Sequence, residues 1–135
     1  MKISTKGRYA LRMLVDLAQN QSEEFVSLAD IAERQSISKK YLEQIVPMIS
    51  KAGLIRTNRG NRGGYMLNVP PDKCSVGDIL RATEGSLAPV ACLEYGENTC
   101  PRKEQCITLY VWEDFYRLTN EYFDGITLQD IIEHK

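Results

Sequence analysis

Three of the four cysteines in this 135-residue chain lie in one short stretch, CLEYGENTCPRKEQC. They are Cys92, Cys100 and Cys106, and their spacing is C-x7-C-x5-C. Thiolates are the ligands of iron–sulfur clusters and also bind zinc well, and a loop that contains glycine and proline can turn its sulfur atoms inward. The stretch therefore indicates a metal site that holds an iron–sulfur cluster or zinc. A redox role of the thiols, or no cofactor at all, are the alternatives.

The expected compartment favours metal or redox chemistry over a disulfide framework. No apolar run approaches the ~18 residues of a membrane helix, and the N-terminal string MKISTKGRYALRML lacks the apolar stretch of a secretory signal. We therefore expect a cytoplasmic protein without a membrane partner, whose thiols stay reduced. Cys74 lies outside the stretch and is expected to be a small packed residue, with a spare ligand or a redox thiol as the alternative.

Charge is distributed unevenly along a chain whose length and composition fit one ordinary globular domain. Residues 1–65 hold 11 Lys and Arg against 6 Asp and Glu, a net charge of +5. Residues 66–135 hold 6 against 12, a net charge of −6. A basic first half suggests an anion-binding module joined to something else, although chance variation of the surface remains the plain alternative.

The periodicity of apolar residues predicts three helices in the first half, over about residues 5–20, 28–35 and 39–52. Ser27 and Ser38 are expected to cap the second and third helices, and Gly53 follows the third where a left-handed residue is favoured. The interior Pro47 should kink or loosen that third helix. Its predicted buried stripe consists of Leu42, Ile45, Val46 and Ile49.

The second half begins with a predicted β-hairpin, which has strands at 54–57 and 65–69 and a glycine-rich tip at 58–64. A short helix at 76–83, capped by Ser75, precedes an irregular segment at 84–105. A long helix is expected at about 104–124, followed by a short helix at 128–132 that is capped by Thr127. The long helix carries a wide apolar seam formed by Ile107, Val111, Phe115, Leu118 and Tyr122, with Leu109, Trp112 and Tyr116 beside it.

This order of elements predicts a mostly α-helical fold with a small β-hairpin, arranged as a winged helix-turn-helix. The second helix of such a pair reads base edges in the major groove of DNA, where glutamine can pair with adenine and lysine can reach guanine or phosphate. A solvated charged helix face and an ordinary hairpin are the alternative. The predicted DNA-contacting residues are Lys39, Lys40, Glu43 and Gln44 on that helix, Arg59 and Arg62 on the hairpin tip, and Lys6, Arg8 and Arg12 on the first helix.

Four strings along nearly the whole chain resemble one bacterial family, the IscR-type iron–sulfur regulators, whose relatives include NsrR and CymR. They are MKISTKGRYALRML, SLADIAERQSISKKYLEQIV, AGLIRTNRGNRGGYML and GITLQDII, with the three-cysteine loop between the last two. The resemblance implies a homodimeric winged-helix regulator whose long helices pair across the two-fold axis. It also implies that Lys40, Gln44 and Arg59 stand at DNA-contacting positions and that Glu43 tunes the choice of site.

The same resemblance implies that Cys92, Cys100 and Cys106 ligate an iron–sulfur cluster, usually [2Fe–2S]. It leaves the fourth ligand open. Leu109 stands where many members carry a histidine, Arg8 stands where the nitric-oxide branch carries an acidic residue, and the single histidine is the penultimate residue, His134. The candidates are Glu43, Glu94, Glu97, Glu104, Cys74, a group of the partner subunit and an exogenous thiol.

We therefore expect a winged helix-turn-helix domain at residues 1–83, a cysteine-containing cluster loop at 84–106, and a dimerisation helix with a short C-terminal helix at 107–135. The expected function is that of a DNA-binding repressor that senses cluster or redox status. A cluster-free regulator of cysteine metabolism, controlled by a partner protein or by thiol oxidation, is the alternative. An enzyme or electron carrier with a small-molecule substrate is not expected, because the usual acid–base and phosphate-binding sets are missing from the sequence.

Overall fold

The helices and strands follow one another in the predicted order. The structure is a computed structural model that describes residues 2–58 and 63–134. The elements are α1 (Thr5–Gln19), α2 (Leu28–Gln35), α3 (Lys39–Lys51), β1 (Ile55–Asn58), β2 (Gly64–Leu67), the 3-10 turn η1 (Pro71–Lys73), α4 (Val76–Glu84), the 3-10 turn η2 (Ala91–Leu93), α5 (Leu109–Asp124) and α6 (Leu128–Glu133). The predicted fold class, mostly helical with a small β-hairpin, is therefore confirmed.

Side-chain caps fix where most of these helices begin. Ser27, Ser38, Ser75 and Thr127 each accept a hydrogen bond from the backbone N–H three residues further on, as predicted. Such a bond satisfies one of the otherwise unpaired donors in the first turn of a helix. Gly53 adopts the left-handed conformation, with φ at +78°, after the end of α3. The local sequence therefore sets these helix limits before any tertiary packing is considered.

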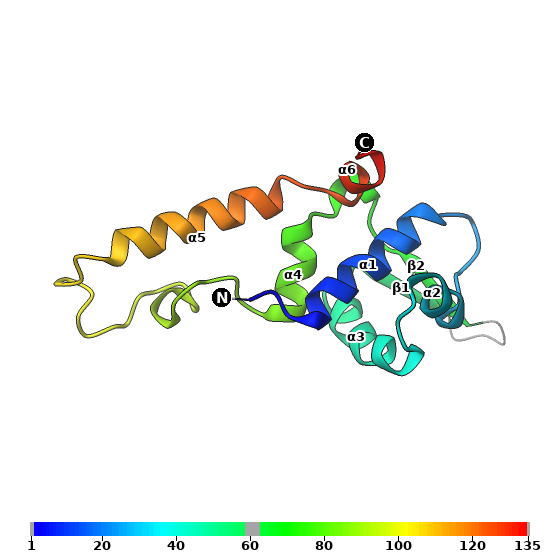
Figure 1. Ribbon diagram of the computed structural model, residues 1–135, viewed down its shortest axis with the longest axis horizontal. Coiled ribbons are helices and arrows are strands. Elements are labelled where there is room, and N and C mark those ends of the chain that lie inside the picture. The colour runs from blue at the N-terminus through cyan, green and yellow to red at the C-terminus, as the bar shows by residue number, and fades with distance from the viewer. Residues whose placement is uncertain (1, 59–62, 135) are drawn as a thin grey trace.

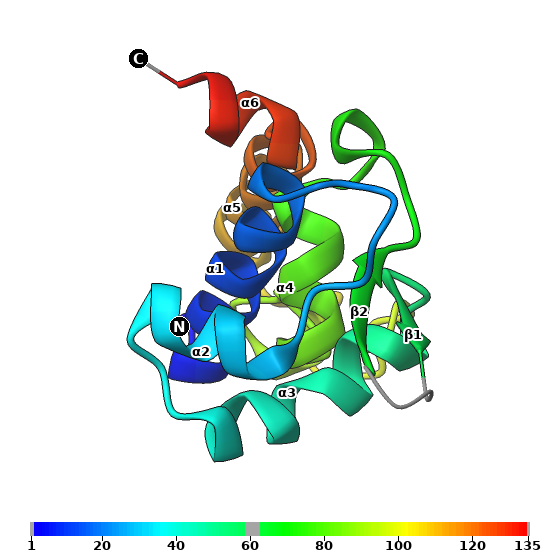
Figure 2. The ribbon, with the colours of Figure 1, turned by 90° about the vertical axis from the view of Figure 1, so that its right-hand side faces the viewer.

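Helix α1 lies at the centre of the main body and packs against α2, α3, α4, β2 and α6 (Figures 1 and 2). Its buried side chains recur at helical spacing and meet the apolar faces of the surrounding helices. Fully enclosed members of this core are Ala10, Met13, Leu14, Ile31, Leu42, Ile45, Ile49, Cys74, Ile79 and Leu128. Cys74 thus occupies a packed core position, as expected.

The hairpin is tied to the segment before α2. Its strands pair antiparallel, with Ile55 opposite Leu67, and Val26 adds an isolated bridge to Tyr65 through two backbone hydrogen bonds of 2.7 and 2.8 Å. A Cβ atom at Gly64 would lie 2.7 Å from the carbonyl oxygen of Val26, so the close approach requires glycine there. The bridge fixes the hairpin beside the helix-turn-helix.

Helix α5 and the segment 85–108 project from the body as an arm (Figure 1). The C-terminal end of α5 is joined to α4 by Arg81, whose guanidinium lies 2.8 Å from a carboxylate oxygen of Asp124 and donates to Asn120. Tyr116 and Phe123 pack nearby against the small apolar cluster of Val76, Leu80 and Leu87. The arm is therefore fastened along the C-terminal half of α5, and the N-terminal half extends away from the body.

One helix limit of the sequence-based prediction is wrong. Helix α5 begins at Leu109 and not near residue 104, because the preceding residues form short turns, such as the bond from the N–H of Lys103 to the oxygen of Cys100. Helix α3 contains Pro47 in its interior, as predicted, and continues to Lys51, while the kink expected at Pro47 stays a prediction. Pro47 is exposed, and the neighbouring Ile45 and Ile49 are buried and hold both flanking turns on the core.

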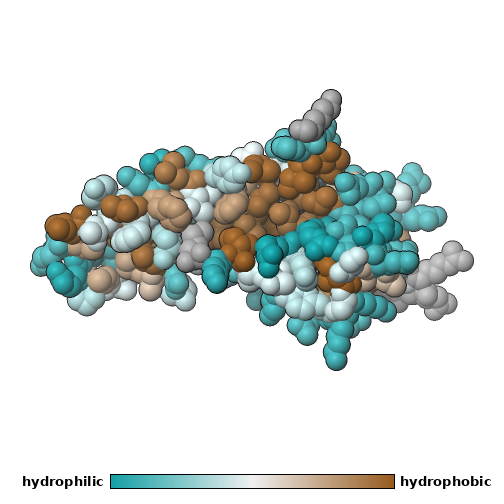
Figure 3. All heavy atoms as spheres, viewed as in Figure 1, coloured by the Kyte–Doolittle hydropathy of each residue, from teal (hydrophilic) through white to brown (hydrophobic). Residues whose placement is uncertain are grey.

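The arm exposes large apolar side chains. No residue of α5 is fully buried, and the exposed set on the arm comprises Tyr95, Ile107, Tyr110, Val111, Trp112, Phe115, Leu118 and Tyr122. Apolar residues also gather where α4 and α6 meet the base of the arm (Figure 3). No helix within residues 2–58 and 63–134 is long and apolar enough to cross a membrane.

Candidate nucleic-acid interface

The outer face of α3 carries the four residues that the sequence predicts for DNA reading. Lys39, Lys40, Glu43 and Gln44 are all exposed, whereas the opposite stripe is buried in the core. The predicted stripe of Leu42, Ile45 and Ile49 is fully enclosed and Val46 is half-buried. The helix thus presents two cations, a carboxylate and an amide to solvent in its first two turns, where a recognition helix contacts bases.

A pocket of about 290 Å³ joins this face to the hairpin. Lys39 and Glu43 line it together with residues that the sequence analysis missed, namely Ser27, Leu28, Ala29, Thr57, Asn58, Gly63, Gly64 and Tyr65. The bridge between Val26 and Tyr65 brings these segments together, so periodicity along one helix or strand gives no signal for the combined surface. The helix-turn-helix and the hairpin therefore form one continuous surface.

The other predicted cations have different surroundings. Arg8 is exposed near the start of α1 and donates to the hydroxyl of Thr5 at 3.1 Å. Arg12 bonds instead to the side chain and the carbonyl oxygen of Gln35, so its guanidinium is engaged within the protein. Arg59 and Arg62 lie outside the described residues. Arg56, which the sequence analysis did not select, is exposed and stacks over Phe25 at 5.9 Å.

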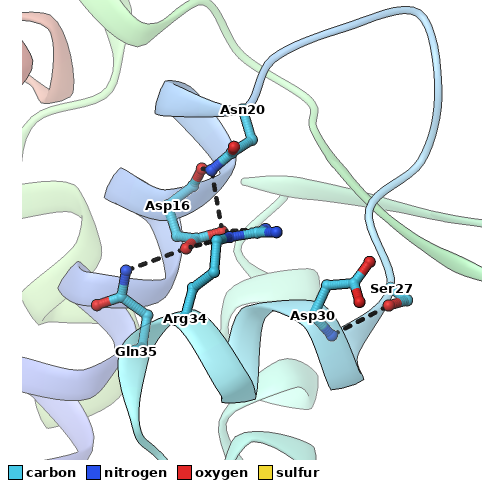
Figure 4. Close-up of polar contacts among 6 residues, drawn as sticks. All are labelled: Asp16, Asn20, Ser27, Asp30, Arg34 and Gln35. Carbon is cyan, nitrogen blue, oxygen red and sulfur yellow. Dashed lines mark hydrogen bonds and ion pairs between the residues drawn. The ribbon is translucent and has the colours of Figure 1, made fainter.

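A buried carboxylate fastens the helix-turn-helix to α1 (Figure 4). The side chain of Asp16 is 2% exposed and accepts two hydrogen bonds from Arg34, at 2.7 and 3.0 Å, and one from Gln35 at 3.0 Å. Burial by itself raises the pKa of Asp16, but the hydrogen bonds from Arg34 and Gln35 and the charge of Arg34 outweigh it, so the pKa lies below its usual value. The ionised form is therefore favoured in the folded protein.

The substitution Asp16→Asn should destabilise the fold at neutral pH by about 2–3 kcal/mol, because a charge-assisted pair is lost at a buried site. A carboxylate whose pKa is depressed by folding stabilises above its unfolded pKa, and this contribution is lost as pH falls through the folded value. The difference in Tm between the wild type and the variant should therefore shrink below about pH 4. Thermal unfolding across pH tests this, with the exposed Asp72→Asn as the matched control; a difference that persists unchanged at pH 2 would contradict it.

The three clustered cysteines are free thiols on the arm and are all half-buried. Cys92 lies in the turn η2, and the backbone N–H of Cys100 donates to the side-chain oxygen of Asn98 at 2.9 Å. The sulfur of Cys106 lies 3.6 Å from the hydroxyl oxygen of Thr108. That hydrogen bond, helped by the backbone N–H of Thr108, holds the pKa of the Cys106 thiol below its ordinary value. Burial raises the pKa of Cys74 to about 11, so its thiol is protonated and inert.

The donor set of the arm suits a soft metal or an iron–sulfur cluster, since three thiols on one irregular segment provide the required ligand type. In the part of the chain that the structure describes, no three Cys, His, Asp or Glu side chains are gathered as a metal site. The three cysteines are thus compatible in kind with a cluster, while the segment 85–108 does not hold them in a closed cage.

A buried helix-turn-helix core, an exposed polar face on α3 and an adjoining hairpin define a winged-helix DNA-binding protein. Residues 3–134 match the model of the Rrf2 family, described as an iron-dependent transcriptional regulator. The chain belongs to this family, and it is a transcription regulator and not an enzyme. The sequence-based identification of the family is therefore confirmed.

Relatives of two kinds resemble the chain throughout its length. The regulator IscR of Aliivibrio salmonicida is 39% identical over 132 residues, which are 98% of this chain and 77% of that protein. CymR of Bacillus subtilis is 40% identical over 134 residues, 99% and 91% of the two chains. Its solved structure, described as the global cysteine regulator, superimposes with a TM-score of 0.79 at 37% identity and covers 100% and 98% of the chains. The structure of T. potens IscR gives 0.76 at 41% identity, covering 98% and 87%.

Proposed function

We propose that this protein is a homodimeric, cytoplasmic DNA-binding repressor whose occupancy of promoters depends on an iron–sulfur cluster held by Cys92, Cys100 and Cys106. The observation that carries the proposal is the placement of three free thiols on the arm between α4 and α5. Residues 1–83 serve as the DNA-binding domain, residues 84–106 as the cluster loop, and residues 107–135 as the dimerisation helix with its short C-terminal helix. Similarity to IscR proteins supports the cluster.

In this proposal α3 enters the major groove. Gln44 pairs with a base edge, Lys39 and Lys40 contact guanine or phosphate, and Glu43 accepts from cytosine or repels unsuitable sites. Arg8 and the hairpin residues Arg59 and Arg62 add contacts to phosphates, which carry no sequence information. The exposure of the four α3 residues and the pocket that Lys39 and Glu43 share with the hairpin support this assignment.

Substitutions on α3 should separate the contribution of base contacts to DNA binding from the contribution of charged contacts to phosphates. Gln44→Ala should cost about 1–3 kcal/mol of discrimination at one base pair, because a bidentate contact is lost. Lys40→Ala should weaken binding to all sequences and reduce the salt slope by about 1. Binding measured over a range of salt concentrations checks both, on a duplex that the wild type selects from a random library. Gln21→Ala and Lys73→Ala are exposed controls on other parts of the surface, and equal losses in the control and α3 variants would refute the assignment.

When bound, the cluster would supply a site whose oxidation or loss signals iron, oxygen or redox status. The three cysteines would hold it, and the acidic residues Glu94, Glu97 and Glu104 on the same segment are candidate fourth ligands, as is a group of the partner subunit. The test is a comparison of DNA affinity between protein reconstituted anaerobically with iron and sulfide and the same protein stripped by a chelator. Equal affinities of the two forms would contradict regulation by a cluster.

A second candidate is a cluster-free regulator that responds to thiol oxidation or to a partner protein. Two observations favour it: the likeness to the cysteine regulator CymR and the open arrangement of the three cysteines, whose thiols are not gathered as a metal site within the described ranges. In this case the stripped protein would bind DNA fully, and mild oxidation of the thiols would change that affinity.

The exposed apolar seam of α5 supports the homodimer. A single chain leaves Val111, Phe115 and Leu118 at 41%, 46% and 55% exposure, and such a continuous apolar surface marks an interaction site. A second copy of α5 is its proposed partner, and the two-fold symmetry would place two α3 helices at the spacing of DNA half-sites.

A further inference from the structure

We infer that Tyr9, Arg12 and Asp16 on α1 form a clasp that sets the direction of α3, and are therefore positioning residues for the reading of DNA. The inference rests on the proposed use of α3 as the recognition helix. The three residues are spaced by three and four positions and so lie on one face of α1. That face holds the end of α2 on one side of the helix-turn-helix and the beginning of α3 on the other.

The first set of contacts in the clasp holds the last turn of α2. Asp16 binds both Arg34 and Gln35, as shown in Figure 4. Arg12 contacts Gln35 twice, through the side-chain oxygen at 3.3 Å and through the backbone carbonyl oxygen. The final two residues of α2 are thus held by two charged side chains of α1, one anionic and one cationic.

The second set of contacts in the clasp holds the first turn of α3. The ring of Tyr9 meets the ring of Tyr41 edge to face, with centroids 5.4 Å apart, and the backbone N–H of Tyr41 donates to the capping hydroxyl of Ser38. The guanidinium of Arg12 lies 5.2 Å above the ring of Tyr9. Arg12 therefore links the two sets of contacts, because it touches both Gln35 at the end of α2 and Tyr9 beside the start of α3.

Only Ser36, Ile37 and Ser38 separate the two held turns. Ser36 adopts a left-handed backbone, with φ at +54°, and Ile37 is buried. Because both ends of this short connection are fixed on α1, the angle of α3 relative to α1 is fixed as well. A bidentate contact between a side chain and a base tolerates only small errors of position, so a looser clasp should reduce the discrimination between sequences before it reduces attraction to phosphates.

The test measures discrimination, which a purely structural role would not alter in the folded protein. A duplex selected by the wild type from a random library and a scrambled duplex of equal length serve as probes, at a temperature where circular dichroism shows all variants folded. Asp16→Asn and Tyr9→Leu should lower the ratio of the two affinities by about tenfold. Binding to the scrambled duplex and its salt slope should stay unchanged, because the phosphate-contacting charges remain.

Two further variants make the outcome decisive. Tyr9→Phe keeps the ring and should keep the wild-type ratio. Ile132→Ala removes a half-buried side chain that packs on the main core from α6, and so reproduces a loss of Tm without touching the clasp. Clasp variants that discriminate as well as Ile132→Ala at a matched loss of Tm would overturn the inference. If the wild type enriches no sequence from the random library, the proposal that α3 reads bases is overturned, and the inference about the clasp is overturned with it.

Discussion

Leu118→Glu should convert the protein to a monomer and reduce its affinity for a two-half-site operator at least a hundredfold. Leu118 is 55% exposed in the single chain and lies on the apolar seam of α5. Fully burying an exposed leucine stabilises by about 1.5–3 kcal/mol, and Leu118 has about half of its surface left to bury, so the two copies in a two-fold dimer together contribute about 1.5–3 kcal/mol. The glutamate adds the cost of burying an unpaired carboxylate, several kcal/mol, in each copy, so the total loss exceeds the roughly 3 kcal/mol that corresponds to a hundredfold weaker association.

Sedimentation velocity measures the monomer fraction, and binding to operators with one and two half-sites measures the effect on DNA. Gln21→Glu is the matched control, because it adds the same charge at an exposed position outside the arm. The monomeric variant should still bind a single half-site, since its helix-turn-helix is intact. A Leu118→Glu protein that stays dimeric, with unchanged operator affinity, would exclude the α5 seam as the dimer interface.

Replacing any one of Cys92, Cys100 and Cys106 by alanine should abolish the visible absorption of protein reconstituted anaerobically with iron and sulfide. A cluster that loses one thiolate of three has too few protein ligands to remain bound. Cys74→Ala is the matched control: its thiol is fully enclosed in the core and has a raised pKa, so this variant should keep both the colour and the iron content.

The reconstitution separates the two proposed modes of regulation. Loss of iron and sulfide in all three variants, with retention in Cys74→Ala, supports the cluster. A wild type that takes up neither iron nor sulfide would eliminate it, and the same four proteins would then be compared for the effect of a mild thiol oxidant on DNA affinity. Dependence on a subset of the arm cysteines in that assay would favour the cluster-free regulator.

Local signals in the sequence were sufficient for most of the fold. The caps Ser27, Ser38 and Ser75 and the apolar stripe of α3 predict helix limits and the buried face, because each depends on residues within one or two turns. The start of α5 was predicted too early, since the apolar period continues back to Ile107 while Thr108 provides no side-chain cap. The spacing of apolar residues does not distinguish these turns from a first turn of helix.

The candidate interface was predictable only in part for a related reason. The four α3 residues follow from one helical face, whereas Thr57 and Ser27 join them only when the hairpin docks beside α2. The pairing of Asp16 with Arg34 spans 18 positions and two helices, so periodicity within one helix gives no indication of it. Such contacts depend on tertiary packing, which a single sequence does not display.

The anchorage of α5 along its C-terminal half makes the other half a mechanical lever. Arg81 holds Asp124 and Asn120, and Tyr116 packs on the cluster of Val76, Leu80 and Leu87, so the helix from Tyr116 back to Leu109 extends about 11 Å beyond the last contact at 1.5 Å per residue. A tilt of roughly 10° about that point would move the free end, next to Cys106, by roughly 2 Å. Conversely, a contraction of about 2 Å among the cysteines would turn this half of the helix by a similar angle, and in the proposed dimer two such levers joined along their apolar seams would transmit the rotation to both subunits together.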